Sequence, residues 1–163
     1  MYQIVIDTRE QNPFLFSDKI ETVAGTIPLG DYTIRGLEDR IAIERKSLSD
    51  LLGSMTNDRP RFVRELKGLR RYAFAALVIE TNWDTIRSGR YRSRMSAASA
   101  LASLISFVVK YGIVPVLADN HEIGAAVTEG LLVQYAKQID AAHKAMHAHE
   151  KKGAVKAWLR RAK

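Results

Sequence analysis

The chain has 163 residues and contains no cysteine, and this absence removes several classes of protein at once. Without thiols there are no disulfide bridges, no zinc fingers and no thiol catalysis. Long apolar runs are also missing, because the longest, 73–79, is far shorter than the roughly 18 residues of a membrane span. Charged side chains at Asp7, Arg9 and Glu10 interrupt the N-terminus before the apolar core of a signal peptide is complete. We therefore expect a soluble cytoplasmic protein without membrane contact.

The remaining composition is that of a folded domain with an uneven distribution of charge. Apolar residues make up 47% and charged residues 26%, which excludes disorder as the main state. The formal net charge is +7, and the whole excess lies in residues 81–163, since the first 80 residues are balanced. A basic surface favours a polyanionic partner, most commonly a nucleic acid. Solvated lysines without any partner would give the same charge.

The order of the apolar segments predicts strands and helices that alternate in the second half of the chain. Strands are expected at 2–7, 21–27, 31–34, 40–46, 74–80 and 113–117. Helices are expected at about 47–55, 59–72, 94–111 and 121–140, and 81–93 is expected to be a polar connection. We therefore predict an α/β domain over 1–140, with a mixed central β-sheet flanked by helices. A basic, partly helical extension is predicted over 141–163.

Two acids and a lysine form the most informative group in the sequence. Glu44 and Lys46 lie two residues apart on a predicted strand, so they project to the same side. If a hairpin pairs this strand with the segment after Gly30, Asp31 comes near Glu44. Carboxylate oxygens hold Mg²⁺, and a lysine can orient water or stabilise phosphoryl charge, so this set suits metal-dependent phosphodiester hydrolysis. The alternative is a solvent-facing strand with an ordinary cross-strand charge pattern.

Arg45 is predicted to point the other way, toward the protein interior, with Ile41 and Ile43. A buried guanidinium needs acidic partners. Asp7, at the end of the first strand, and Asp50, one turn into the following helix, are the expected ones. Asp50 also completes a capping-box pattern that begins at Ser47.

Three blocks of sequence closely resemble the XPF-type nuclease domain, a family of structure-specific endonucleases in the PD-(D/E)XK nuclease superfamily. They are IDTRE at 6–10, LGDY at 29–32 and IERKSLSDL at 43–51. The resemblance covers about residues 3–135 and implies a restriction-endonuclease-like fold. It implies a Mg²⁺- or Mn²⁺-dependent endonuclease that cuts DNA at flaps, forks and 3′ overhangs, and nuclease domains that pair as homodimers through their helices. In a prokaryote, such an enzyme is expected to be associated with the nucleoid.

The resemblance also implies residue roles. Asp31 and Glu44 look like metal ligands, Glu10 like an acid that reaches the metal through water, and Lys46 like the catalytic lysine. The family's remaining polar active-site positions match Asp7, Arg9, Arg45 and Asp50. A catalytically silent DNA-binding scaffold of the same fold, or a junction resolvase or restriction-like nuclease of the superfamily, remain the alternatives.

One departure from the family concerns the grip on DNA. Residues 136–163 are too few for the tandem helix-hairpin-helix module that commonly follows the nuclease domain. The basic tail 151–163 or an additional DNA-binding subunit is then expected to supply these contacts, and a solvated terminal helix is the equal alternative.

Several further residues have two interpretations each. Six arginines are candidates for contact with DNA phosphates, against a solvated surface: Arg61, Arg64, Arg87, Arg90, Arg92 and Arg94. Trp83 and Tyr91 either stack on unpaired bases or anchor their loop to the core. His143, His147 and His149 have the spacing of a metal site, but a solvated helix face fits them better. The segment 13–16 is either a clamp beneath the active-site loop or an exposed patch.

Overall fold

A computed structural model of the chain describes residues 2–161, with side chains described for residues 2–147 and 149. The strands are β1 (Gln3–Asp7), β2 (Glu21–Gly25), β3 (Tyr32–Ile34), β4 (Ile41–Ser47), β5 (Phe74–Glu80) and β6 (Val114–Leu117). The helices are α1 (Leu48–Thr56), α2 (Arg59–Leu69), α3 (Trp83–Ser88), α4 (Ala97–Tyr111) and α5 (His121–Arg161).

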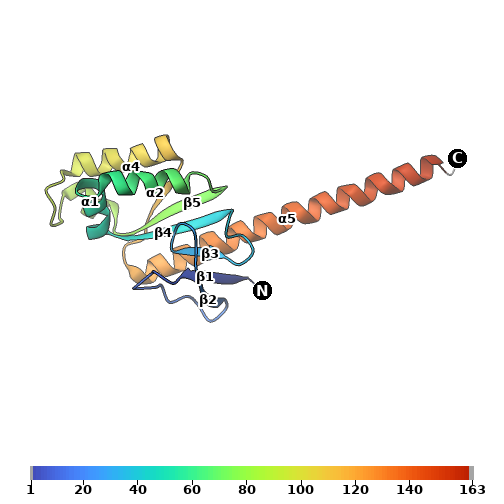
Figure 1. Cartoon of the computed structure of the whole chain (residues 1–163), viewed down its shortest axis with the longest axis horizontal. Helices are drawn as coiled ribbons and strands as arrows, with labels where there is room; N and C mark the ends of the chain where they lie inside the picture. Colours follow the sequence, from blue (N-terminus) through green and yellow to red (C-terminus); the bar gives the residue numbers. More distant parts are fainter. Residues whose placement is uncertain (1, 162–163) are drawn as a thin grey trace.

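All the strands belong to one sheet in the order β2-β1-β3-β4-β5-β6. β1 runs parallel to β2, and β4 and β6 each run parallel to β5. β3 is antiparallel to both of its neighbours, β1 and β4. Figure 1 shows α1, α2 and α4 over one face of this sheet and the first part of α5 across the other. The predicted mixed sheet flanked by helices is confirmed.

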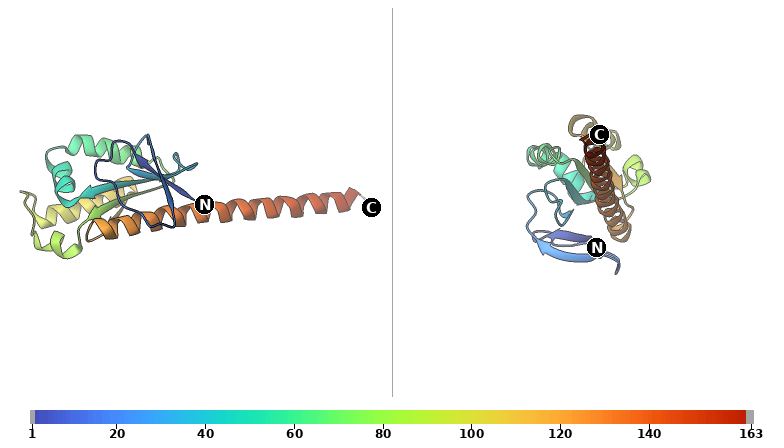
Figure 2. Two further views of the ribbon diagram at one scale, coloured as in Figure 1. Left: turned by 90° about the horizontal axis from the view of Figure 1, so that it is seen from below. Right: turned by 90° about the vertical axis from the view of Figure 1, so that its right-hand side faces the viewer.

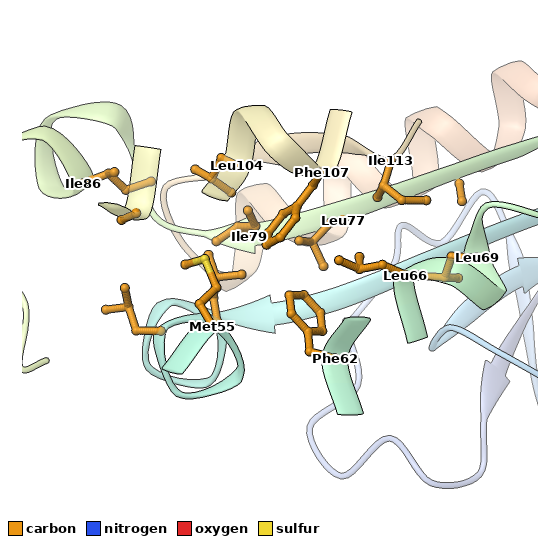
Figure 3. Close-up of a cluster of buried hydrophobic side chains, with 14 of the residues drawn as sticks. Met55, Phe62, Leu66, Leu69, Leu77, Ile79, Ile86, Leu104, Phe107 and Ile113 are labelled. Carbon is orange, nitrogen blue, oxygen red and sulfur yellow. The ribbon is translucent and has the colours of Figure 1, made fainter. Parts of the chain in front are cut away.

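β5 is the buried central strand that its apolar run predicts. Its alternate residues pack against the helices on the two faces of the sheet. Leu77 and Ile79 enter a cluster with residues of α1, α2 and α4 (Figure 3). Ala76 and Val78 face the opposite cluster, which contains residues of α5. Burial of each large aliphatic side chain contributes roughly 1.5–3 kcal/mol, so this strand joins both halves of the core.

β4 alternates in the same way, and this alternation positions the polar residues at its carboxyl end. Ala42 packs in the cluster with α1 and α2, whereas Ile41 and Ile43 pack in the cluster with α5. Continuing the period of two, Glu44 and Lys46 share the face of Ala42, and Arg45 shares the face of the isoleucines.

The region expected as a polar connection contains the short helix α3. Asn82 caps this helix by accepting a hydrogen bond from the Thr85 backbone N–H at 2.9 Å, and Gly89 ends it at a φ of 65°. A helix of six residues is too short to show an apolar period, which is why the sequence did not reveal it.

Helix α5 is much longer than the expected 121–140. It continues without a break to Arg161, and Figures 1 and 2 show its second half projecting from the sheet. The predicted boundary at residue 140 therefore falls inside one helix, and the division into domain and extension stays a prediction. No helix in the described part of the chain is both long and apolar enough to cross a membrane.

Candidate active site

The hairpin between β3 and β4 brings Asp31 beside Glu44, as the sequence predicts. Tyr32 pairs with Ile43 across the two strands, and the Asp31 N–H donates to the Ile43 carbonyl at 2.8 Å. The Arg45 backbone N–H in turn donates to Asp31 Oδ2 at 2.7 Å. These bonds hold Asp31 against the strand that carries Glu44.

Gly30 makes this close approach possible. Its φ is +87°, and a Cβ at this position would lie 3.1 Å from the Ile43 carbonyl oxygen and 3.2 Å from the Ala42 Cβ. A side chain would meet both a left-handed backbone conformation and a crowded neighbour. The glycine before Asp31 is therefore part of how the carboxylate reaches β4.

Lys46 lies between two glutamates on the same face of β4. Its Nζ is 2.5 Å from Glu44 Oε1 and 3.6 Å from Glu65 Oε1, and it stands 5.5 Å from the centre of the Phe62 ring. Glu65 comes from α2 and was not among the predicted site residues. Its position in the basic face of that helix offered the only signal, a single acid among arginines and lysines.

The carboxylates at this site carry an excess of negative charge. Burial raises the pKa of Asp31 to about 6, and the charges of Glu10 and Glu65 act in the same direction. Burial, then Asp31 and a hydrogen bond with Glu65, raise the pKa of Glu44 well above its ordinary value. Burial tends to lower the pKa of Lys46, but Glu44 and Glu65 outweigh it, and the net shift is upward. The lysine therefore stays an ammonium, and the acids need further positive charge.

A divalent cation fits this requirement. Asp31 and Glu44 offer carboxylate oxygens in a cavity of about 830 Å³, and the open volume leaves room for the several waters that Mg²⁺ retains. Among the residues that the structure describes, no three acidic or histidine side chains are grouped closely enough to ligate one metal. Glu10 lines the cavity, but its Oε1 accepts from the Asn12 N–H at 2.7 Å. Its predicted contact through water stays a prediction.

Asp7 and Arg9 also line the cavity, where they bind each other. Asp7 Oδ1 accepts from Arg9 N and Nε at 2.8 and 2.7 Å, and Oδ2 accepts from Arg9 Nη2 at 3.0 Å and from the Ile27 N–H at 2.7 Å. The side-chain hydrogen bonds from Arg9 lower the pKa of Asp7 to about 2 despite its burial. With both oxygens occupied, Asp7 joins the end of β1 to the segment after β2.

Arg45 has different partners from those predicted. Its Nε lies 2.5 Å from Glu80 Oε1, its Nη1 lies 3.5 Å from Glu10 Oε1, and its guanidinium carbon stands 5.6 Å from the centre of the Phe14 ring. The prediction of Asp7 and Asp50 was wrong. Asp7 is occupied by Arg9, and Asp50 belongs to α1, which covers the opposite face of β4.

His121 lies with Arg45 and Glu80 in a second cluster of charged side chains. Neither His121 nor Glu80 was among the predicted site residues. His121 Nδ1 is 3.0 Å from the Glu80 Oε1 that binds Arg45, and its ring centre is 4.7 Å from that of Phe14. Both residues sit at the ends of predicted elements, Glu80 as the last residue of β5 and His121 as the first residue of α5. Only the folded sheet brings these ends together.

Ser47 caps helix α1, with Asp50 in the first turn as its partner. The Asp50 N–H donates to Ser47 Oγ at 3.1 Å, and the Ser47 hydroxyl donates to Asp50 Oδ2 at 2.7 Å. Asp50 also lines the large cavity, so a role in the site is compatible with its role at the cap.

The six candidate arginines fall into three groups. Arg61 and Arg64 line the large cavity. Arg87 pairs with Asp84 at 3.0 Å and the Nε of Arg90 donates to Ser88 Oγ at 2.9 Å. The remaining two, Arg92 and Arg94, line a separate cavity beside α1.

The other residues with two interpretations are now separable. Tyr91 packs against the core, whereas Trp83 exposes 54% of its surface. Phe14 is buried and stacks on Tyr32 with ring centres 5.2 Å apart, so it forms a clamp, while the next residue, Leu15, is exposed. The three histidines are exposed and belong to no metal-binding group of the described residues: His143, His147 and His149.

Solved structures with the same fold include two of XPF from Aeropyrum pernix. The structure in complex with DNA has a TM-score of 0.66 and 23% identity, over 85% of this chain and 66% of that one. The structure without DNA has a TM-score of 0.64 and 23% identity, over 82% of this chain and 61% of that one.

Curated relatives match this chain over small parts of their own length. One is a protein of Methanocaldococcus jannaschii named as an ATP-dependent RNA helicase, 26% identical over 137 residues that make up 83% of this chain and 15% of the relative. Another is the DNA repair protein RAD1 of Saccharomyces cerevisiae, 37% identical over 82 residues, 47% of this chain and 7% of the relative.

The family model of the ERCC4 domain matches residues 6–131, a range that includes Asp31, Glu44 and Lys46. With the fold of the XPF nuclease domain around these residues, the chain belongs to the ERCC4 domain family of XPF-type nucleases.

Proposed function

We propose that this protein is a divalent-metal-dependent DNA endonuclease that hydrolyses phosphodiester bonds at branched, flap or fork structures. The observation that carries the proposal is the juxtaposition of Asp31 and Glu44 with Lys46, in a cavity that Arg61 and Arg64 also line. A DNA substrate would place the protein with the DNA of its cell.

Asp31 and Glu44 would hold Mg²⁺ or Mn²⁺ through their carboxylate oxygens. When bound, the cation stabilises charge on the phosphoryl oxygens and lowers the pKa of a bound water. The excess of acids at the site supports this choice, since two crowded carboxylates repel each other without a cation.

Lys46 supplies a fixed positive charge next to the reacting phosphate. Glu44 and Glu65 hold its ammonium and keep it protonated, so it can donate a hydrogen bond to water or to a phosphoryl oxygen. A preorganised donor of this kind acts without reorganising during the reaction. Arg61 and Arg64 would bind phosphates on either side of the cleaved bond.

The test is cleavage of flap, fork, 3′-overhang and blunt duplex DNA by the purified protein with Mg²⁺ or Mn²⁺. Asp31→Asn and Lys46→Ala are each expected to lower the rate by about a hundredfold or more. Asp18→Asn and Lys67→Ala, at exposed positions outside the cavity, are the matched controls and should keep the wild-type rate. Cleavage that survives both active-site variants would overturn the proposal.

Two other functions give different results in the same assay. A catalytically silent scaffold would bind DNA in a salt-sensitive way and cut no substrate with any divalent metal. A junction resolvase would cut a four-way junction in preference to flaps, and a restriction-like enzyme would cut plain duplex.

A second copy of the chain is the proposed partner for an exposed apolar face on α4. Leu101, Ile105, Val108 and Val109 follow helical spacing and expose between 43% and 78% of their surface. Apolar residues gathered on one face in this way mark interaction sites. Light scattering is expected to give a dimer for the wild type and a monomer for Val109→Glu. A wild-type monomer at micromolar concentration would contradict pairing, and DNA contacts would then depend more on an additional subunit.

A further inference from the structure

Three cavities of the protein lie next to one another and share lining residues. The large cavity at Asp31 and Glu44 shares four lining residues with a neighbouring cavity of about 330 Å³: Lys46, Asp50, Arg61 and Glu65. This second cavity shares Ser49 and Gly53 with a third, of about 450 Å³, which Arg92 and Arg94 also line. We call the second and third cavities the α1 groove, because both are lined by residues of helix α1.

The far end of the α1 groove carries unopposed positive charge. Arg92 and Arg94 are the charged residues that line the third cavity, and neither makes a salt bridge or hydrogen bond with another described side chain. The other two arginines of the same segment differ, since Arg87 pairs with Asp84 and Arg90 donates to Ser88. Guanidinium groups without acidic partners suit phosphate oxygens.

The middle of the α1 groove is not basic, which limits where phosphates can lie. Asp50, Asp58 and Glu65 line the second cavity with Lys46 and Arg61. These acids would repel a phosphate in the middle of the groove. Phosphates are therefore expected at its two ends.

The surroundings of the groove favour a single strand over a duplex. Cavities of about 330 and 450 Å³ are too small to receive a DNA duplex. Trp83 exposes 54% of its surface at the start of α3, and an exposed indole stacks on unpaired bases. β4 and β5 end at the same edge of the sheet, with Ser47 paired to Glu80, so α1 and α3 start there together. Figures 1 and 2 show the segment after α3 beside α1.

We propose that the α1 groove holds a single DNA strand that extends from the phosphodiester at Asp31 and Glu44, with Arg92 and Arg94 binding a phosphate of that strand on the far side of α1. The inference rests on the proposed nuclease function of the large cavity. According to this inference, the segment with Arg92 and Arg94 selects DNA that has an unpaired strand at the site of cleavage.

The test compares two double variants from the same segment. Arg92→Gln with Arg94→Gln removes the two unopposed charges, and Arg87→Gln with Arg90→Gln removes two charges that already have partners. Binding is measured by fluorescence anisotropy without metal, on a dye-labelled duplex with a ten-nucleotide single-stranded extension and on the same duplex with blunt ends. All four arginines are exposed, and circular dichroism checks that both variants fold.

For the extended DNA, Arg92→Gln with Arg94→Gln is expected to lower the slope of log affinity against log salt by about 0.7, the value for one phosphate contact on a single strand. Its affinity for blunt DNA should equal that of the Arg87→Gln, Arg90→Gln control. An equal loss on both DNAs, or an equal loss in the control, would overturn the inference.

A second variant tests the groove without changing charge. A Cβ on Gly53 meets no atom within 4 Å, and Gly53 lines both the second and the third cavity, so Gly53→Leu places an apolar side chain where the two cavities adjoin. It should weaken binding of extended DNA alone. Gly130→Leu, on α5 and equally open, is the control and should bind as the wild type does. Unchanged binding in Gly53→Leu would overturn the path across α1.

The results separate this inference from the proposed nuclease function. Cleavage by the wild-type protein with Mg²⁺, combined with no effect of the groove variants, would overturn the inference alone. The expected binding effects without cleavage would overturn the nuclease function and leave the strand path supported.

Discussion

Residues 44 to 46 of one strand contribute to two clusters of charge on opposite faces of the sheet. On one face, Lys46 serves Glu44 and Glu65 beside Asp31, so three carboxylates share one ammonium. On the other, Arg45 pairs with Glu80 and Glu10 among the rings of Phe14 and His121. The first cluster has an excess of negative charge beside an open cavity. In the second, which Glu10 and Arg45 join to the same cavity, the guanidinium is matched by acids and lies beside aromatic rings.

The difference indicates what each cluster does. A packed ion pair surrounded by rings keeps its geometry but offers no free coordination site. Crowded acids with raised pKa values beside an open cavity are unstable alone and become favourable when a cation binds. We therefore assign a role in stability to the Arg45 cluster and a role in metal binding and catalysis to the Lys46 cluster. The following variants test that assignment.

The largest effect on stability is expected from Arg45→Met. It leaves Glu80, whose side chain is 15% exposed, without its guanidinium, which should lower the free energy of unfolding by about 3 kcal/mol. Urea unfolding of the variant measures the loss. Adding Glu80→Gln should recover a substantial part of it, because the second change removes the unpaired charge. A double variant as unstable as the sum of the single ones would show that the pair does not act as a unit.

The second-largest effect is expected from metal binding, which should depend on the acids beside Lys46 and not on the Arg45 cluster. At a Mn²⁺ concentration a hundred times the dissociation constant, the wild-type protein should gain about 2.7 kcal/mol of stability. Asp31→Asn should lose this gain but keep its fold, since the amide oxygen can still accept from the Arg45 N–H. Melting temperatures with and without Mn²⁺ measure the difference, and Asp18→Asn is the control. An undiminished shift in Asp31→Asn would place the ion elsewhere.

The pH dependence of stability without metal should have opposite signs for two acids of the cavity. Asp31 has its pKa raised to about 6, so it favours the folded state when protonated and stability falls as pH rises from about 4 to 6. Asp7 has its pKa lowered to about 2, so it contributes about 2 kcal/mol at neutral pH that is lost as pH falls from about 4 to 2.

Urea titrations at several pH values resolve the two acids. Asp31→Asn should remove the decline between pH 4 and 6, and Asp7→Asn should remove the decline toward pH 2. A decline between pH 4 and 6 that persists in Asp31→Asn would assign it to another group.

The smallest effect is expected at the cap of α1. Ser47→Ala removes the acceptor for the Asp50 N–H and should lower stability by about 1 kcal/mol. Thermal unfolding measures this loss, and Ser54→Ala, inside the same helix, is the control. An equal loss in both variants would show that the cap contributes nothing specific.

Local patterns predicted most of the fold and the centre of the site. The strand at 74–80, the cap of α1 and the alternation of β4 follow from neighbouring residues alone. Asp31 and Glu44 were predictable as a pair because a short hairpin joins them. The helix α3 was missed, since six residues show no period.

The amino-acid sequence by itself determined which residue types stand at the site, the order of the elements and the faces on which Glu44, Arg45 and Lys46 lie, because the period of a strand is a local property. Only the tertiary structure decided their partners. Glu65, Glu80 and His121 come from α2, β5 and α5, and long-range packing brings these elements to β4. Which acid meets which cation depends on how separate elements pack in space, and spacing along the chain carries no record of that.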